Sequence, residues 1–393
     1  MKKPPLSMFS TENFKAIQKS GRINFGWLTC FIGNNGVGKS SLIEALETFR
    51  DVVLLGLDPA LRRWRGLDHV WNKARERKLC HLDSSRPSLN HELKFQFDWK
   101  WNGKHFRGDQ SISQGSGGNS MFIETEHLTY KRPDRTEVWS RTEPGKVSCT
   151  GDEGKGTKAT TFKQPAPGDG ESMLKSLAWD WMPFWQFLML NPERMGQPTP
   201  QQLASHRVTL ARDGSNIAEY LNEIRELDAN AFAGILEALR FVLPYAKDLQ
   251  PALTSELERA FYLRLNENNY QVPGWLLSTG TLRIVAILAC LRHPKPPPLL
   301  VIEEIENGLD PRTLHLVVEE IRAAITAGTT QVILTTHSPY LVDLLDLSHI
   351  VVVEREEGQP VFRRPDAEQL ADWSKSFSPG RLYTMGRLTR GDQ

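Results

Sequence analysis

The chain has 393 residues, with 48 lysines and arginines against 47 aspartates and glutamates, which gives a net charge of +1. This balance excludes a histone-like or tail-type nucleic-acid binder, because such proteins depend on an excess of positive charge. With 39% hydrophobic residues, the chain suits one large or two ordinary globular domains.

Strands around one early helix are predicted for the first part of the chain. The apolar run from Leu28 to Ile32 ends in glycine, which predicts a buried strand, and a helical pattern follows it. Apolar and polar residues alternate over 93–101, and the sheet is expected to continue through 121–139, which predicts antiparallel strands with one buried face. The stretches 111–120 and 143–172 are rich in Gly, Ser, Thr, Lys and Pro, so we expect mobile loops there.

A helical segment and then a parallel sheet are predicted for the rest of the chain. Ile217, Tyr220, Leu221, Ile224 and Leu227 recur at helical spacing, so 171–260 is expected to be mainly helical. Beyond it, helical patterns alternate with short apolar strands at 299–302, 332–336 and 350–353. This alternation is typical of a parallel sheet.

The remaining composition argues against a membrane or disulfide-bonded protein. The longest apolar run, Ile284 to Leu291, is far shorter than the roughly 20 residues of a membrane span. The N-terminus has two lysines but no apolar segment behind them, so we expect no secretory signal, no membrane partner and a cytoplasmic location. The four cysteines stand far apart and predict neither a disulfide framework nor a zinc site.

A phosphate-binding pattern follows the first predicted strand. The segment from Gly33 to Ser40 matches G-x-x-x-x-G-K-[ST] between a strand and a helix. Glycines let backbone amides surround a polyphosphate, and the helix N-terminus adds positive potential. Lys39 is expected to reach the β- and γ-phosphates, and Ser40 to hold Mg²⁺. The expected nucleotide-binding residues are Gly33, Asn34, Asn35, Gly36, Val37, Gly38, Lys39, Ser40 and Ser41.

Two acids end a later apolar strand. Glu303 at the strand tip is suited to orient Mg²⁺ through its water shell, and Glu304 to polarise an attacking water as general base. Paired glutamates at a solvated strand end are the alternative. The phosphate-binding pattern upstream favours the functional interpretation.

Small residues open the apolar helix predicted at 284–291. Ser278, Thr279, Gly280 and Thr281 offer a hydroxyl, a glycine that permits close approach and free amides, all suited to a γ-phosphate. Alone, the same residues would be read as a simple helix cap. The order of the motifs along the chain favours the ligand-binding interpretation. After these residues come the acidic strand, then Asn307 and Asp310, and then a strand followed by His337. We predict that His337 contacts the γ-phosphate instead of serving as a packing or surface histidine.

In this order the motifs resemble the ABC-type ATPase head shared by transporters, SMC proteins, RecF-like repair proteins and OLD-family proteins. Residues 33–40 resemble Walker A, 278–281 the signature motif, 303–304 Walker B, 307–310 the D-loop, and His337 the switch histidine; Asn13-Phe14-Lys15 resembles the opening of RecF and SMC heads. Glu303 stands where that family usually has Asp, which would slow turnover, and the signature reads S-T-G-T instead of S-G-G-Q. More narrowly, the chain is similar to stand-alone bacterial ATPases of the RecF/OLD-like class.

The resemblance implies an α/β fold: an ABC-type ATPase head with a mixed sheet around the P-loop, an antiparallel β subdomain and an inserted helical lobe. It assigns 1–170 to an N-terminal ATPase lobe, 171–272 to a helical insertion lobe and 273–393 to a C-terminal ATPase lobe. It also implies an ATP hydrolase that uses Mg²⁺, with Lys39, Glu304 and His337 as catalytic residues. The expected assembly is a homodimer with ATP between the heads, in which Ser278 and Gly280 complete the partner's site and Asp310 couples the two sites.

Two outputs remain open. Many relatives implied by the resemblance are encoded in phage-defence or genome-maintenance operons, so the dimer is expected to switch a separate effector protein, such as a toxin or nuclease. The alternative is a RecF-like DNA-binding ATPase in DNA repair. This alternative is suggested by a basic and aromatic cluster that includes Arg62, Arg63, Arg65, Lys73 and Arg75. A cluster of basic residues is also consistent with a solvated or partner-facing surface. A third reading, an inert nucleotide-bound scaffold, would be excluded by measurable turnover.

Overall fold

The computed structural model describes residues 3–73, 92–115, 120–133, 135–143, 146–152, 157–160, 167–201, 207–255, 258–267 and 270–388. The chain folds into two units, each built from separate stretches of sequence. Unit 1 comprises residues 1–26, 33–183 and 351–364, and unit 2 comprises 27–32, 184–350 and 365–393. The boundaries predicted at 170 and 272 do not coincide with these units.

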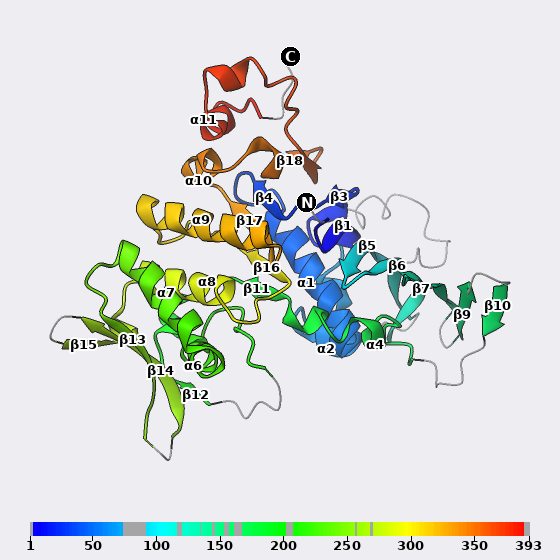
Figure 1. The fold of residues 1–393 in the computed structure, drawn as a ribbon. Helices are drawn as coiled ribbons and strands as arrows, with labels where there is room; N and C mark the ends of the chain where they lie inside the picture. The colour runs from blue at the N-terminus through cyan, green and yellow to red at the C-terminus, as the bar shows by residue number, and fades with distance from the viewer. Residues whose placement is uncertain are drawn as a thin grey trace. The chain divides into compact units, whose positions relative to one another are not determined.

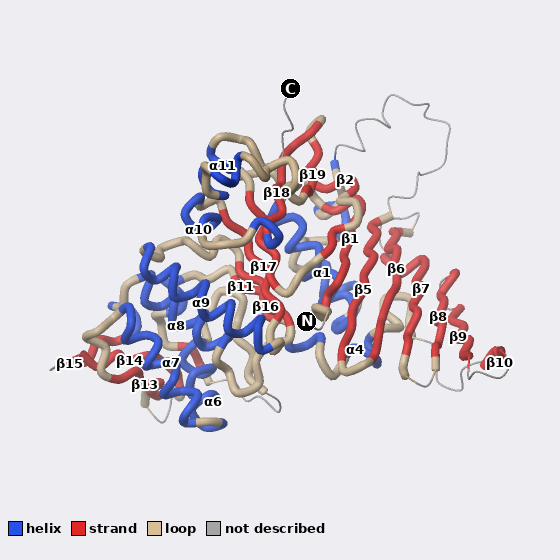
Figure 2. The backbone as a smooth tube through the Cα atoms, turned by 45° about the horizontal axis from the view of Figure 1, so that its top comes forward, coloured by secondary structure: helices blue, strands red, loops and turns tan. Residues whose placement is uncertain are grey.

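Unit 1 contains a nine-stranded antiparallel sheet with the order β10-β9-β8-β7-β6-β5-β1-β2, and β3 also pairs with β1. The strands β5 to β10 lie side by side in Figure 2. Their bounds are β1 (Leu6–Phe14), β2 (Ile17–Lys19), β3 (Ile23–Asn24), β5 (Leu93–Trp101), β6 (Lys104–Gln114), β7 (Met121–Lys131), β8 (Thr136–Glu143), β9 (Lys146–Asp152) and β10 (Thr157–Thr160). The antiparallel strands predicted over 93–101 and 121–139 are confirmed.

Aromatic packing holds the first helix against this sheet. The Phe49 ring of α1 (Lys39–Leu55) lies 5.7 Å from the ring of Phe95 and 4.9 Å from that of Phe97, both on β5. These contacts fix the helix that follows the phosphate-binding segment. Unit 1 also contains α2 (Leu57–Arg62), the 3₁₀ helix η1 (Leu67–His69), α4 (Lys175–Ala178) and most of a hairpin formed by β18 (Ile350–Glu356) and β19 (Gln359–Arg363).

The prediction of mobile loops at 111–120 and 143–172 is wrong for much of both stretches. Residues 111–114 continue β6, and residues 146–152 and 157–160 form β9 and β10. Backbone hydrogen bonds of the ladder form whatever the side chains are, so composition alone misjudged these strands. Arg141, fully buried on β8, donates to the carbonyls of Gly168 (3.2 Å) and Glu171 (2.8 Å) and so fixes the returning chain. Residues 116–119, 144–145, 153–156 and 161–166 lie outside the described residues.

Unit 2 is built on four adjacent parallel strands in the order β11-β16-β17-β4, which confirms the predicted parallel pairing for the strands at 299–302 and 332–336. Every residue of these strands is buried, as expected for a parallel sheet covered on both faces. Their bounds are β11 (Gln186–Leu188), β16 (Leu299–Ile302), β17 (Gln331–Thr336) and β4 (Leu28–Ile32). The accompanying helices are α5 (Pro192–Met195), α8 (Thr279–Leu291), α9 (Pro311–Ala327), α10 (Pro339–Asp343) and α11 (Pro379–Thr384), and the 3₁₀ helices are η3 (Gly274–Leu276), η4 (Leu347–His349) and η5 (Trp373–Lys375). In sequence, η2 (Met182–Phe184) contains the last residues of one stretch of unit 1 and the first residue of the next stretch of unit 2.

The segment predicted to be mainly helical is helical only in part. It contains α6 (Ile217–Leu227) and α7 (Ala229–Val242), but a small antiparallel sheet surrounds them in sequence, seen at the lower left of Figure 1. This sheet consists of β12 (Thr199–Pro200), β13 (Asp248–Leu253), β14 (Ala260–Glu267) and β15 (Tyr270–Pro273). On β14 the buried residues Phe261, Leu263 and Leu265 alternate with half-buried ones, a period of two that the neighbouring helical pattern masked.

The parallel and antiparallel sheets with their helices make an α/β fold, as predicted. Within the described ranges, no helix combines the length and apolar character needed to cross a membrane.

Candidate functional site

The phosphate loop, residues 33–40, runs from the end of β4 to the start of α1. Gly33 has φ +152°, and a Cβ atom there would lie 2.3 Å from the carbonyl oxygen of Val353. Gly38 has φ +114° and forms the N-cap of α1 without any side-chain cap. Both positions therefore require glycine, and the first amides of α1 are left to a ligand or to water.

Lys39 is folded over this loop. Its side chain is buried, and Nζ donates to the carbonyl oxygens of Gly33 (2.5 Å) and Asn34 (2.9 Å). Asn34, Asn35 and Ser40 are exposed beside it. An ammonium group and open helix amides on an exposed loop are the elements of an anion site, so the loop's geometry fits the polyphosphate predicted for it.

The two predicted acids that follow β16, Glu303 and Glu304, have different surroundings in unit 2. Glu303 is buried, and its Oε1 accepts a hydrogen bond from Nη2 of Arg212 at 2.8 Å. Glu304 has a left-handed backbone with φ +48°, its N–H donates to Oγ1 of Thr335, and its Oε2 accepts from Nδ2 of Asn307 at 2.5 Å. Non-glycine residues in this backbone region are rare and concentrate at functional sites. The sequence interpretation missed Arg212, because nothing near it in sequence marks it as a partner of Glu303.

A second residue missed by sequence reasoning, the acid Glu306, lies against the predicted switch histidine. Oε1 of Glu306 accepts from the backbone N–H of His337 at 2.8 Å and lies 3.2 Å from its Nδ1. The His337 side chain remains 43% exposed, whereas that of Glu306 is only 9% exposed. Tyr383 of α11 has a raised pKa because of burial and, second, the charge of Glu306. The carboxylate therefore holds one edge of the imidazole and leaves the rest of the ring open.

The signature turn, residues 278–281, contacts the D-loop of its own chain. Oγ of Ser278 accepts from the N–H of Thr281 and caps α8, while Ser278 and Thr279 are exposed. A Cβ on Gly280 would lie 2.6 Å from the carbonyl oxygen of Gly308, so only glycine permits this approach. Both the cap interpretation and an exposed, ligand-accessible turn are thus compatible with the local structure.

Asp310 ends the D-loop as the N-cap of α9. Its pKa is lowered by the hydrogen bond from the Thr313 hydroxyl and by backbone N–H groups, including those of Thr313 and Arg312. The carboxylate is thereby engaged in the helix cap, a local role that the D-loop assignment did not include.

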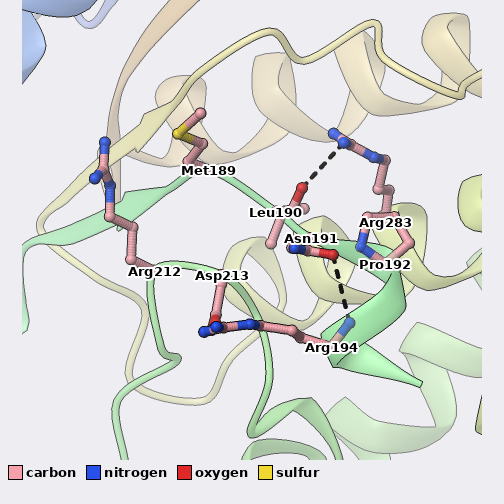
Figure 3. A pocket seen from close by; sticks show the side chains of 8 residues that line it. All are labelled: Met189, Leu190, Asn191, Pro192, Arg194, Arg212, Asp213 and Arg283. Atoms are coloured by element: carbon pink, nitrogen blue, oxygen red, sulfur yellow. Dashed lines mark hydrogen bonds and ion pairs between the residues drawn. The ribbon is translucent and has the colours of Figure 1, made fainter. Parts of the chain in front are cut away.

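A pocket of about 690 Å³ in unit 2 brings three arginines together. Figure 3 shows the guanidinium groups of Arg194, Arg212 and Arg283 on different sides of it. Arg283, half-buried on α8, donates to the carbonyl of Leu190 at 3.0 Å, and burial lowers its pKa.

The predicted basic cluster is only partly available to a ligand. Arg63 pairs with Glu47 at 2.7 Å and Asp51 at 3.4 Å, and its guanidinium stacks on Trp64. Arg62, Arg65 and Lys73 are exposed. Arg75 lies outside the described residues. The opening Asn13-Phe14-Lys15 motif supports this region, since Nζ of Lys15 lies 3.5 Å from the centroid of the Trp64 ring.

Two family models match the chain. Residues 171–343 match one described as "AAA domain, putative AbiEii toxin, Type IV TA system", and residues 6–126 match one described as "AAA ATPase domain". The chain is also 28% identical over 170 residues to the Nod factor export ATP-binding protein I of Sinorhizobium fredii, covering 42% of this chain and 46% of that protein. The protein of the same name from Rhizobium etli is 30% identical over 143 residues, covering 36% of this chain and 41% of that protein. The chain thus spans less than half the length of these curated relatives.

Among solved structures, a match is found with the Smc head domain with an extended coiled coil bound to the C-terminal domain of ScpA, derived from Pyrococcus furiosus. The TM-score is 0.50 at 13% sequence identity, covering 95% of this chain and 99% of that chain. This likeness shows the fold of an ABC-type ATPase head. The two family matches agree with this fold, because both models describe AAA-type ATPase domains.

Proposed function

We propose that two copies of the chain bind ATP between them, and that hydrolysis releases them, so that the dimer acts as a switch for a separate effector. The observation that carries the ATP site is the phosphate loop, in which Gly33 and Gly38 permit the close backbone path and Lys39 supplies the charge. Lys39 and Ser40 would contact the phosphates, Glu304 would take the proton of the attacking water, and His337 would contact the γ-phosphate.

Magnesium fits the oxygen donors that the sequence offers. Mg²⁺ prefers a hydroxyl, one or two carboxylates and substrate phosphates over a cage made of protein alone. Ser40 and Glu303 would hold the ion, which neutralises developing phosphate charge when bound, and Arg212 would have to yield part of its contact with Glu303.

The exposed signature turn supports the dimer. Ser278 and Thr279 are exposed. Two of the three residues of the preceding η3, Trp275 and Leu276, are 48% and 69% exposed. Large apolar side chains left in water beside a ligand-binding turn are typical of a contact surface. We infer that this surface docks on the ATP-loaded phosphate loop of the second copy.

Anti-phage defence is the role we propose for the switch. The family description over residues 171–343 reads "putative AbiEii toxin, Type IV TA system", which supports a role of the chain in a toxin–antitoxin system. In this proposal the ATP-bound dimer restrains or activates an effector encoded as a separate protein. A RecF-like DNA-binding ATPase is the second candidate, favoured by the exposed Arg62, Arg65 and Lys73.

The decisive experiment measures ATP turnover by wild type, Glu304→Gln and Lys39→Ala, with size-exclusion chromatography in ATP. Glu304→Gln is expected to bind ATP, lose turnover and remain dimeric, and Lys39→Ala to lose ATP binding. A Glu304→Gln protein with the wild-type rate would contradict the assignment. Repeating the assay with double-stranded DNA over a salt series separates the outputs, since stimulation that fades with salt would favour the DNA-binding candidate.

A further inference from the structure

The pocket of about 690 Å³ in unit 2, called the arginine pocket from here on, has more cationic than anionic side chains in its lining. The lining contains three guanidinium groups and one carboxylate, that of Asp213, and its residues are Met189, Leu190, Asn191, Pro192, Arg194, Arg212, Asp213 and Arg283. The phosphate loop, Glu304 and His337 are not part of this lining. The proposed catalytic roles therefore leave the pocket unexplained.

Each of the three guanidinium groups is already held in place. Arg212 contacts Glu303 at 2.8 Å, Arg194 contacts Asp213 at 3.0 Å, and Arg283 donates to the carbonyl of Leu190 at 3.0 Å. A guanidinium has five N–H donors, so the contacts of Arg194 and Arg283 orient these two groups without using all of their donors. The donors are thus positioned before any ligand arrives, which reduces the entropic cost of binding.

Arg283 carries the strongest argument for an anion. It is half-buried on α8, and within the described part of the chain no carboxylate lies within ion-pair distance of it. Removing a cation from water is costly, and a single carbonyl compensates little of that cost. The charges of Glu304 and Glu306 act on Arg283 only from beyond ion-pair distance, so an anion in the pocket would supply an opposite charge in direct contact.

We propose that the arginine pocket binds a phosphate-type oxyanion at a site separate from the phosphate loop. Arginine forks match the tetrahedral oxygens of phosphate with two parallel hydrogen bonds. Two sources are compatible with this chemistry: free inorganic phosphate, and the terminal phosphate of a nucleotide. Arg212 lines the pocket and also contacts Glu303, the proposed metal ligand, so phosphate released by hydrolysis could bind in the pocket. This use of the pocket rests on the proposed function.

The test is calorimetric titration of inorganic phosphate into the full-length Lys39→Ala protein at low salt, where binding through the phosphate loop is weakened. Lys39→Ala is expected to keep a phosphate site. Adding Arg283→Ala should weaken that site about ten- to a hundredfold, the loss expected for one charge-assisted contact. Arg225→Ala, which removes an exposed arginine of α6 outside the pocket, should leave it unchanged.

Arg194→Ala is the second variant, because its 71% exposed side chain can be removed without disturbing the fold, and it should weaken phosphate severalfold even if Arg283→Ala fails to fold. Absence of phosphate binding in Lys39→Ala, or binding indifferent to both pocket arginines, would overturn the proposal. Titrating ATP into the same protein identifies the source: Arg283-dependent ATP binding indicates a nucleotide phosphate, and its absence beside phosphate binding indicates the free anion. A wild type that turns over no ATP while the pocket still binds phosphate would reject the proposed function and leave the pocket standing.

Discussion

At the scale of single residues, the glycines of the phosphate loop meet different constraints. Gly33 combines φ +152° with a carbonyl 2.3 Å from the position of a Cβ, whereas Gly36 has φ +77° and open space around it. Gly36→Ala should therefore cost only backbone strain, about 1–2 kcal/mol of unfolding free energy. Gly33→Ala should cost more, because Val353 must also move. Urea unfolding followed by circular dichroism measures both variants, and equal losses would show that the close approach is unimportant.

Glu306 is the residue-scale feature with the clearest chemical consequence. Its carboxylate, 3.2 Å from Nδ1 of His337, favours a proton on that nitrogen and leaves Nε2 to face outward. Glu306→Gln keeps the shape but removes the charge. If His337 contacts the γ-phosphate as proposed, kcat should fall about ten- to a hundredfold, the loss typical of outer hydrogen-bond partners of metal-bound histidines, with KM for ATP little changed. The nitrogen-15 chemical shifts of the His337 ring, measured by NMR, should also differ between wild type and Glu306→Gln.

The matched control for that variant is Glu319→Gln, which removes an exposed carboxylate of α9 that pairs with Arg322. It should leave both the kinetics and the His337 spectrum as in wild type. If Glu306→Gln changes kcat while the His337 shifts stay constant, Glu306 acts through the fold and not through the imidazole.

At the scale of elements, the sequence predicted best where a local pattern and its surroundings agree. The apolar run at 28–32 with its glycine-rich loop predicted β4 and α1, because strand, turn and helix signals are consecutive there. The strands β9, β10 and β13 to β15 were missed because pairing with a neighbour, and not composition, holds them. Arg212 and Glu306 were missed for a related reason: Arg212 lies 91 residues from Glu303, and Glu306 lies 31 residues from His337. Side-chain partners that far apart leave no spacing to detect.

The N-cap of α9 makes a pH-dependent contribution to stability. Because the folded-state pKa of Asp310 is lowered, the cap is fully effective above the ordinary pKa of about 3.9 and weakens as the pH falls through the folded value. Asp310→Ala should lose about 1 kcal/mol at pH 7. Asp310→Asn keeps a capping oxygen and should lose less. Unfolding curves at pH 7 and pH 3 check this, and the gap between wild type and Asp310→Ala must narrow in acid.

At the scale of the whole molecule, association cannot rely on overall charge. With a net charge of +1, two copies neither repel nor attract each other strongly at long range. The proposed dimer must therefore draw on nucleotide and on apolar surface. Trp275 and Leu276, exposed beside the signature turn, are the apolar residues placed to supply it.

Leu276→Asp tests this requirement directly. The side chain is 69% exposed, so the change should leave the fold and ATP binding intact while placing a desolvated charge in the contact between copies. In the Glu304→Gln background with ATP, sedimentation velocity should show a dimer that becomes monomeric when Leu276→Asp is added. Leu253→Asp, at a 45% exposed leucine that ends β13, should keep the dimer. A dimer that survives Leu276→Asp would move the contact away from the signature turn, since a charge buried against a partner without an opposite charge weakens binding by orders of magnitude.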